Sequence, residues 1–318
     1  MEPDVLQGGV RSSFAWYREF LPCEALRPDV YALFSFSPGT GLTSTSRPPL
    51  REVQFRAGSV CAPQFADAQV SIRFELGQTC DASGRWRADS NALGGTVIGP
   101  MSAVGRTGAL DLSETVGVYF RPGRASLFFG IPLSDLTDAA VVVADIWGGR
   151  AARLSGELAE LSEAARIDRL ESILLAGRRP ERHRATLLDI DSLAASVLRR
   201  AGRVTVERLA GASGVSRQHL ARVFREQIGV GPKLYIRLTR FQSVLSFTAA
   251  GPGIDWASAA LDMGFADQSH MIAECRRFSG LTPRSIADRD WFHPFIERAK
   301  SRRRRRAAYV SDRSGPDR

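Results

Sequence analysis

The sequence predicts an α+β protein: an N-terminal β-barrel or β-sandwich, then a helical pair, then an all-α domain with two helix-turn-helix units. Three observations indicate this class. Short apolar runs separated by Gly and Pro occupy the first 120 residues, and a helix-turn-helix pattern appears twice near the C-terminus. Charge also divides the chain, because residues 1–182 carry a net charge of −2 and residues 183–318 carry +11. A neutral half followed by a basic half is typical of a regulatory domain joined to a domain that binds a polyanion.

The chain length and these patterns set the domain organisation. With 318 residues and 44% apolar content, two or three domains with buried cores are expected. We place a β domain at 1–150, a helical connector at 151–182, a helix-turn-helix domain at 183–290 and a basic tail at 291–318. The tail contains five consecutive arginines, Arg302 to Arg306. Such a charge block is usually solvated, and it would add attraction to phosphates without base specificity.

The front half is predicted to be mainly β. Its candidate strands are short and bounded by Gly and Pro, as in a sandwich or barrel. They are Val30 to Phe36, Val53 to Phe55, Val70 to Glu75, Thr96 to Ile98 and Val116 to Phe120.

The connector is predicted to be helical over Arg153 to Ala176. Leu154, Leu158, Leu161 and Ala165 form a stripe at helical spacing, and Asp168 with Glu171 predicts the cap of a second helix. Two interpretations of the stripe stay open: an interface between two copies of the chain, or packing on the chain's own β domain. The polar run that follows, Gly177 to Arg184, is the expected linker.

The first helix-turn-helix unit runs from Val206 to Pro232. Its apolar residues lie on one helical face, Gly214 marks the turn and Ser216 is expected to cap the second helix. Glycine suits this turn because the two helices approach closely and the residue leaving the first helix often needs a positive φ. A supporting helix is expected before the unit, over Ile190 to Ala201, with its inward side chains at Leu193, Val197 and Leu198.

The second unit runs from Ile254 to Pro283 and repeats the landmarks of the first. Gly264 matches Gly214 at an offset of fifty, and after the turn the offset is fifty-one, so one residue is inserted there. A long helix over Lys233 to Phe247 joins the units and, if rigid, would hold the two recognition helices about 34 Å apart, one turn of DNA. Ala249 to Gly253, AAGPG, is expected to free the second unit from this helix.

The runs GVSRQHLARVF…GVGP and GFADQSH…FSGLTP resemble the DNA-binding domain of the AraC/XylS family of bacterial transcription regulators. The resemblance covers roughly the last 130 residues before the tail, and it implies double-stranded DNA and RNA polymerase as partners and activation of transcription. The sequence departs from the family at Met271 and Cys275, where Phe is usual, and at Ala273, where Arg is frequent. These departures put the base readout of the second unit in doubt.

The outward faces and the matched motifs together give the candidate DNA-binding residues. Arg222 matches the family's base-contacting arginine, and an arginine fork can hold O6 and N7 of one guanine. The second unit is expected to discriminate bases weakly, because it has lost the longest side chain at Ala273. The full candidate set is Ser216, Arg217, Gln218, Ala221, Arg222, Arg225, Asp267, Gln268, Ser269, Ala273, Arg276 and Arg277.

The segment from Val118 to Gly149 and the opening YREFLPCEALRPDVYALFSF resemble the cupin-like sensor domain of some of these regulators. Metal-dependent cupin enzymes hold their metal with histidines, and the first 182 residues contain none. We therefore expect no enzyme activity, no metal and no cofactor. A pocket for a small organic effector stays possible, although a role in the core is the simpler interpretation for each of its candidate residues, which are Phe34, Phe36, Phe55, Phe74, Trp86, Tyr119 and Phe120.

The four cysteines are scattered and are expected to be free thiols. The longest apolar run, Ala139 to Ala144, is too short to span a bilayer and the acidic start lacks an apolar segment, which predicts a cytoplasmic protein without a membrane partner. Two other functions remain open: a fused DNA repair or modification enzyme that uses the same DNA-binding unit, and a dimeric DNA binder without an effector. The first would need a cysteine in a Pro-Cys-His or Cys-x-x-Cys setting, which none of the four has.

Overall fold

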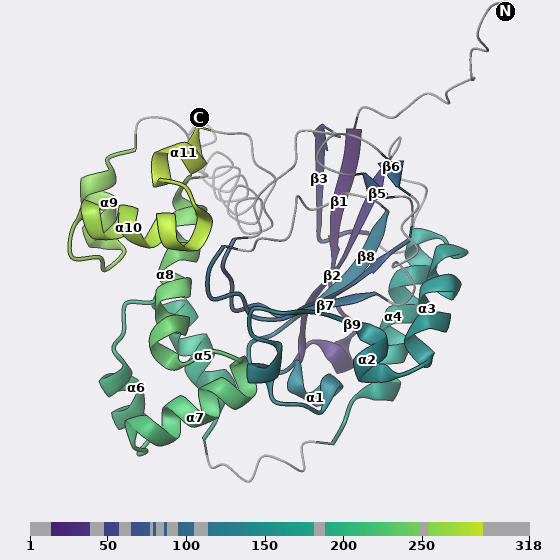
Figure 1. Ribbon diagram of the computed structural model, residues 1–318, viewed down its shortest axis with the longest axis horizontal. Coiled ribbons are helices and arrows are strands. Elements are labelled where there is room, and N and C mark those ends of the chain that lie inside the picture. The colour runs from purple at the N-terminus through teal and green to yellow at the C-terminus, as the bar shows by residue number, and fades with distance from the viewer. Residues whose placement is uncertain are drawn as a thin grey trace, which may run out of the picture.

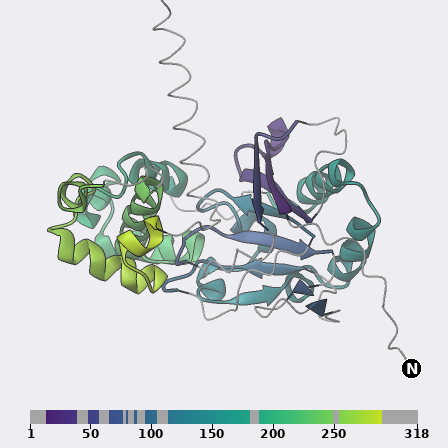
Figure 2. The same cartoon turned by 90° about the horizontal axis from the view of Figure 1, so that it is seen from above.

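The computed structural model describes residues 14–38, 48–56, 65–76, 79–80, 86–87, 95–104, 114–180, 188–248 and 254–288. Its front half is built on a seven-stranded antiparallel sheet in the order β3-β1-β2-β8-β4-β7-β9 (Figure 1). In Figure 2 the purple first strands rise steeply from the later blue ones, so the sheet is strongly curved. The strands are β1 (Phe14–Phe20), β2 (Val30–Pro38), β3 (Arg51–Arg56), β4 (Ser71–Glu75), β7 (Thr96–Ile98), β8 (Thr115–Phe120) and β9 (Ala140–Val142), with a separate pair of β5 (Thr79–Cys80) and β6 (Trp86–Arg87).

The five predicted strands are confirmed, and the α+β class with them. Strand β1 was not predicted, because two charged residues, Arg18 and Glu19, interrupt its apolar pattern. Both side chains are buried. The Nε of Arg18 donates to Glu52 at 2.8 Å and its Nη1 donates to Glu163 at 3.0 Å, so partners on β3 and on a distant helix compensate the burial of its charge.

Side chains on both faces of the sheet are buried. One face carries a small aromatic cluster in which Phe34 stacks on Tyr119 with ring centroids 4.4 Å apart. The central strand β8 is buried along its whole length, and a Cβ at Gly117 would lie 2.3 Å from the ring of Phe34, so only glycine fits there. The other face packs on the helices of the front half, which are η1 (Glu24–Leu26), α1 (Ser126–Phe129), η3 (Leu133–Leu136), α2 (Val143–Trp147), α3 (Arg150–Ala159) and α4 (Glu163–Gly177).

The helical connector is confirmed as the pair α3 and α4, but its internal boundary differs from the prediction. Helix α4 begins at Glu163, and Asp168 lies exposed inside it, so the predicted start at Asp168 is wrong. The break falls earlier because Arg166 turns back on α3: its Nε donates to the carbonyl of Leu158 at 2.7 Å and its Nη2 to that of Ala159 at 3.1 Å. These are carbonyls that the end of a helix leaves without a partner.

The C-terminal half is helical and surrounds α8, as Figure 1 shows. Helices α6 and α7 lie beside one part of α8, and α9, α10 and α11 beside the other. In α5 the buried face is Ile190, Ala194 and Val197, whereas Leu198 is 42% exposed, so its predicted inward position is wrong. The helices are α5 (Ile190–Arg199), α6 (Val206–Ala212), α7 (Arg217–Ile228), α8 (Pro232–Thr248), α9 (Trp256–Asp262), α10 (Gln268–Ser279) and α11 (Pro283–Ala287).

Two arginines of α8 hold the second unit. Arg237 forms a two-pronged pair with Glu274 of α10, with both N···O distances at 2.6 Å. Arg240 donates to the carbonyl of Gly202 at 3.0 Å and to that of Gly264 at 3.2 Å. The segment Ala249 to Gly253 lies outside the described residues, but these contacts show that the second unit is not free of α8.

The pair on α10 is partly buried, with the side chain of Glu274 only 12% exposed. Burial on its own would raise the pKa of Glu274, but the hydrogen bonds and charge of Arg237, helped by other basic side chains nearby, outweigh it and lower that pKa. The pKa of Arg237 is raised, chiefly by its hydrogen bond to Glu274.

Within the described ranges no helix is long and apolar enough to cross a membrane.

We expect Glu274→Gln to lower the free energy of unfolding by about 1.5–3 kcal/mol at pH 7, because it removes a charge-assisted pair. The folded-state pKa of Glu274 lies below the unfolded value, so the pair stabilises fully above the unfolded pKa and this stability is lost as the pH falls through the folded pKa. Thermal unfolding at pH 7 and in acid measures the difference, which should shrink in acid.

The matched control is Asp288→Asn, which removes the exposed partner of Arg284 and should change stability by less than about 1 kcal/mol. If parent and Glu274→Gln were equally stable at pH 7, the pair would not be holding α10 to α8.

Candidate nucleic-acid interface

The two helix-turn-helix units are built alike. Each has a first helix of seven residues and a second helix of twelve, α6 and α7 in one unit and α9 and α10 in the other. Gly214 and Gly264 occupy the turns with φ of 65° and 81°, so the predicted need for a positive φ is confirmed at both. The first helices are offset by fifty residues and the second helices by fifty-one, which confirms the inserted residue.

The start of each second helix is capped by a side chain. The hydroxyl of Ser216 accepts from the backbone N–H of His219 at 3.2 Å, and the carboxylate of Asp267 accepts from that of His270 at 2.8 Å. The cap at Ser216 was predicted. Capping leaves the first turn of each helix ordered, and this turn is the part of a recognition helix that meets base edges.

The candidate DNA-binding residues lie together on the outer faces of α7 and α10. Ala221 is half-buried and the other eleven are exposed. Their opposite faces are in the core, where Leu220, Phe224, Met271 and Cys275 are fully buried. The exposed set is Ser216, Arg217, Gln218, Arg222, Arg225, Asp267, Gln268, Ser269, Ala273, Arg276 and Arg277. Which of them contact DNA remains a prediction.

Two of the exposed arginines of α7 have acidic partners on the surface. The Nη1 of Arg222 lies 2.8 Å and 3.0 Å from the two carboxylate oxygens of Glu226, one helical turn away. Arg217 lies 3.4 Å from Glu207 of α6, whose pKa is lowered by its own backbone hydrogen bond and by the Thr205 hydroxyl. Exposed pairs of this kind contribute little, so a guanine or a phosphate can replace the carboxylate.

His270 supports the turn of the second unit. Its Nδ1 accepts from the backbone N–H of Ala266 at 3.3 Å, and its ring meets the Phe265 ring edge to face at 5.5 Å. A histidine engaged in this way stabilises the turn at Gly264. Ala273 is exposed on the same helix, and its side chain is too short to reach far into a groove.

The C-terminal end of α7 is docked on the front domain, a contact that sequence reasoning missed. Gly229 ends the helix with φ of 93°, and a Cβ there would lie 2.6 Å from Pro100 and 2.8 Å from the carbonyl oxygen of Leu133. The hydroxyl of Thr137 donates to the carbonyl of Gly229 at 2.6 Å. Gly280, the equivalent residue of α10, has no such neighbour among the described residues. In the sequence only Gly229 could have indicated this contact, and a glycine at that position is already explained by its role as the cap that ends α7.

A second contact joins the front domain to α8 and α10. The ring of Phe65 meets that of Phe241 of α8 at 6.0 Å, and the N–H of Ala66 donates to the carbonyl of Phe278 at 2.8 Å. The side chain of Gln242 donates to Asp67 at 2.6 Å. The front domain therefore contacts both recognition helices near their C-terminal ends.

The buried carboxylate of Asp29, a residue of the front domain, helps to link that domain to α5. Asp29 is fully buried and pairs with Arg178, just after α4, at 2.6 Å and with Arg124 at 3.5 Å. Arg124 also pairs with Asp191 in the first turn of α5. These pairs connect the end of α4 to the helix-turn-helix domain.

The aromatic residues considered for an effector pocket are mostly core residues. Phe34, Phe36, Phe74, Tyr119 and Phe120 are each at most 7% exposed and pack on other apolar side chains. The side chains of the other two candidates, Phe55 and Trp86, lie outside the described residues, as does the arginine-rich tail.

In the described part of the chain, no cluster of His, Cys, Asp and Glu could hold a metal ion. Burial, with the charge of Glu274, raises the pKa of the Cys275 thiol to about 12. Cys275 is therefore a protonated core residue at neutral pH, poorly suited to the nucleophilic role that a repair enzyme would need.

A family model described as "Helix-turn-helix domain" matches residues 209–289, and one described as "Domain of unknown function (DUF6597)" matches residues 18–142. No curated protein matches the chain. The C-terminal domain of the two-component response regulator yesN from Fusobacterium nucleatum is similar at 15% identity, over 32% of this chain and 100% of that chain, with a TM-score of 0.29. ToxT from Vibrio cholerae is similar at 14% identity, over 71% of this chain and 92% of that chain, with a TM-score of 0.38.

The family match falls on the region in which two turns, two capped helices and two exposed outer faces repeat at offsets of fifty and fifty-one residues. The chain thus carries an AraC-type helix-turn-helix domain behind a domain of unknown function, which supports a role as a DNA-binding regulator.

Proposed function

We propose that this chain is a transcription activator that places α7 and α10 in two successive major grooves and contacts RNA polymerase at the promoter. The observation that carries the proposal is the pair of capped recognition helices, equal in length and exposed on their outer faces, held on one shared helix, α8. Two helices positioned in this way suit a single protomer that reads an extended site on one side of the duplex. A footprint with RNA polymerase and a promoter-reporter assay test the two parts of this proposal.

The two units have different roles in this proposal. The first reads bases with Gln218 and Arg222, which can pair with adenine and guanine edges. The second anchors the protein, because Arg276 and Arg277 reach phosphates while Ala273 cannot discriminate bases. The boundaries at 150, 182 and 290 between the domains belong to the same proposal.

We further propose that the front domain senses a small effector and transmits its state to both recognition helices. The contacts at Gly229 and Phe278 support this role, because each meets the end of a recognition helix. The apolar stripe of α3 and α4 packs on the sheet of its own chain, which favours sensing over dimerisation through this stripe.

Arg222→Ala should weaken binding to the preferred DNA site by about 1–3 kcal/mol and relax the preference at one base pair, since a two-pronged guanine contact is lost. Electrophoretic mobility shifts on a set of single-base variants of the site measure both effects. Arg121→Ala, an exposed arginine of the front domain, is the control and should leave binding unchanged. Unchanged affinity and base preference in Arg222→Ala would remove this residue from the interface.

Selection of bound sequences from a random library should yield an asymmetric site: one half with two or three sharply defined base pairs and one degenerate half. The cause is the short side chain at Ala273 beside Gln268 and Ser269. Ala273→Arg should tighten binding by about 1–3 kcal/mol only where a guanine lies beneath it. Equal information in both halves would contradict the division of roles, and equal tightening on every sequence would show that the new arginine meets phosphate.

A further inference from the structure

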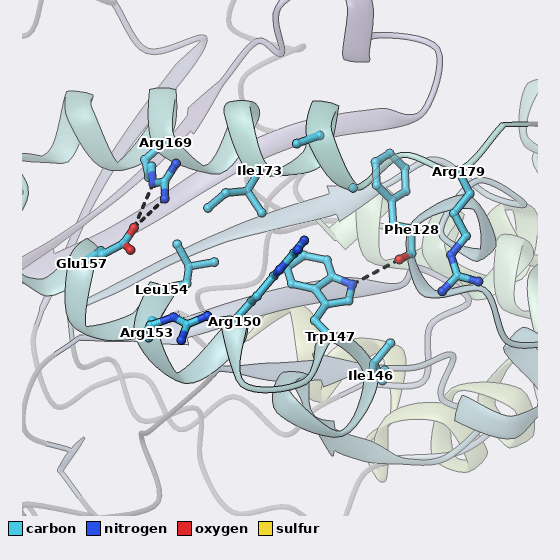
Figure 3. Close-up of a pocket in the computed structure, with 12 residues that line it drawn as sticks. Phe128, Ile146, Trp147, Arg150, Arg153, Leu154, Glu157, Arg169, Ile173 and Arg179 are labelled. Atoms are coloured by element: carbon cyan, nitrogen blue, oxygen red, sulfur yellow. Dashed lines mark hydrogen bonds and ion pairs between the residues drawn. The ribbon is translucent and has the colours of Figure 1, made fainter.

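A pocket of about 460 Å³ lies between α1, α2, α3 and α4, on the side of the front half away from the helix-turn-helix domain. Its volume is within the range of small-molecule sites in proteins, roughly 300–1,000 Å³. Figure 3 shows side chains from both long helices facing it, Ile173 from α4 and Leu154 from α3, with Trp147 of α2 below them. No function described above uses this pocket.

The apolar part of the pocket is held firmly. Phe128 is buried under the sheet, and Leu154 is 4% exposed. The indole Nε1 of Trp147 donates to the carbonyl of Phe128 at 3.1 Å, which fixes the orientation of the ring. Ile146 and Ile173 complete the wall. A rigid apolar wall of this kind takes an apolar or aromatic body with little loss of entropy on the protein side.

The rim of the pocket is strongly basic. Four arginines line it, Arg150, Arg153, Arg169 and Arg179, against a single carboxylate, Glu157. Glu157 accepts from Nε and Nη2 of Arg169 at 3.0 Å and 2.7 Å. Among the described residues no carboxylate pairs with the other three, so the lining carries three uncompensated positive charges.

These guanidinium groups are distributed along the pocket. In Figure 3, Arg169 and Arg179 stand at its two sides, with Arg150 between them beside Trp147. Two contacts with the segment around α1 position Arg179. Its backbone N–H donates to the carbonyl of Leu127 at 2.9 Å, and its guanidinium occupies the space that a Cβ at Gly130 would fill. Guanidinium groups form two parallel hydrogen bonds with carboxylates and phosphates, which selects for anions of that geometry.

We propose that this pocket binds an amphipathic organic anion, with an apolar or aromatic body against Trp147 and Leu154 and a carboxylate or phosphate group held by the basic rim, where Arg150 lies centrally beside Trp147. The identity of this anion as the effector rests on the proposed function; its binding does not.

The position of the pocket also explains how binding would reach the DNA-binding half. Arg179 directly follows Arg178, whose Nε lies 2.6 Å from the buried Asp29. Asp29 shares Arg124 with Asp191 in the first turn of α5. An anion held by Arg179 would therefore act on a residue next to a chain of ion pairs that ends in the helix-turn-helix domain.

Isothermal titration calorimetry of the full chain tests binding with three probes that share one body: biphenyl-4-carboxylate, biphenyl-4-yl phosphate and the neutral biphenyl-4-carboxamide. We expect one or both anions to bind at least tenfold more tightly than the amide, and the tighter anion identifies the head group. Binding of the amide as tight as that of both anions, or no binding of either anion at millimolar concentration, would overturn the proposal.

Variants locate the site. Arg150→Gln with Arg153→Gln should weaken anion binding at least tenfold, and Ala176→Trp, on the exposed side of α4, should block the pocket by volume. Arg121→Gln, an exposed arginine outside the pocket, is the matched control and should bind as the parent does. Anion binding unaffected by both pocket changes would place it elsewhere and overturn the proposal.

Mobility shifts with DNA in the absence of any anion separate this inference from the function on which it rests. A chain that binds DNA but no anion contradicts only the pocket, whereas one that binds the anion but no DNA contradicts only the regulator. A shift in DNA affinity on adding the anion, lost in Ala176→Trp, would identify it as an effector.

Discussion

The shared apolar surface of α8 is the constraint on which the rest of this structure depends. Phe241 of this helix meets Phe278 of α10 on one side and Phe65 of the front domain on another, with ring centroids 5.6 Å and 6.0 Å apart. Tyr235, near its start, meets Phe224 of α7. One continuous core therefore contains both reading units and a segment of the front domain. Because such a core is close-packed, these parts do not shift independently of one another.

Much of the helix-turn-helix domain could be predicted from the sequence, because its determinants are local. Helix caps, turn glycines and helical periodicity act over a few residues, and they repeat at nearly the same spacing in both units. The cap at Ser216 and the positive φ at Gly214 and Gly264 follow from the residues themselves. Five strands of the front half were predictable from their apolar runs, whereas β9, which lies in the longest apolar run, was not predicted.

The predictions failed where distant residues decide the structure. Strand β1 carries buried charges whose partners lie on β3 and α4, and no local pattern indicates such compensation. The break between α3 and α4 depends on Arg166, which reaches back to the previous helix. The arginines of the pocket come from α3, α4 and the segment after it, and their sequence positions alone do not show that they surround one cavity. Docking of the front domain on α7 likewise joins residues more than ninety positions apart.

The contact of Gly229 with the front domain anchors the C-terminal end of α7, so any tilt of this helix would pivot about that end. A helix of twelve residues is about 18 Å long, so a tilt of about 10° about that end would move its first residues by roughly 3 Å. This displacement is about the donor–acceptor distance of one hydrogen bond, and it would move Gln218, a candidate base-contacting residue, while leaving the helix itself intact. Among the described residues, nothing meets Gly280 of α10 as Pro100 and Leu133 meet Gly229. Because both helices share one core with the front domain, a rearrangement at Gly229 would act first on α7 and reach α10 through α8.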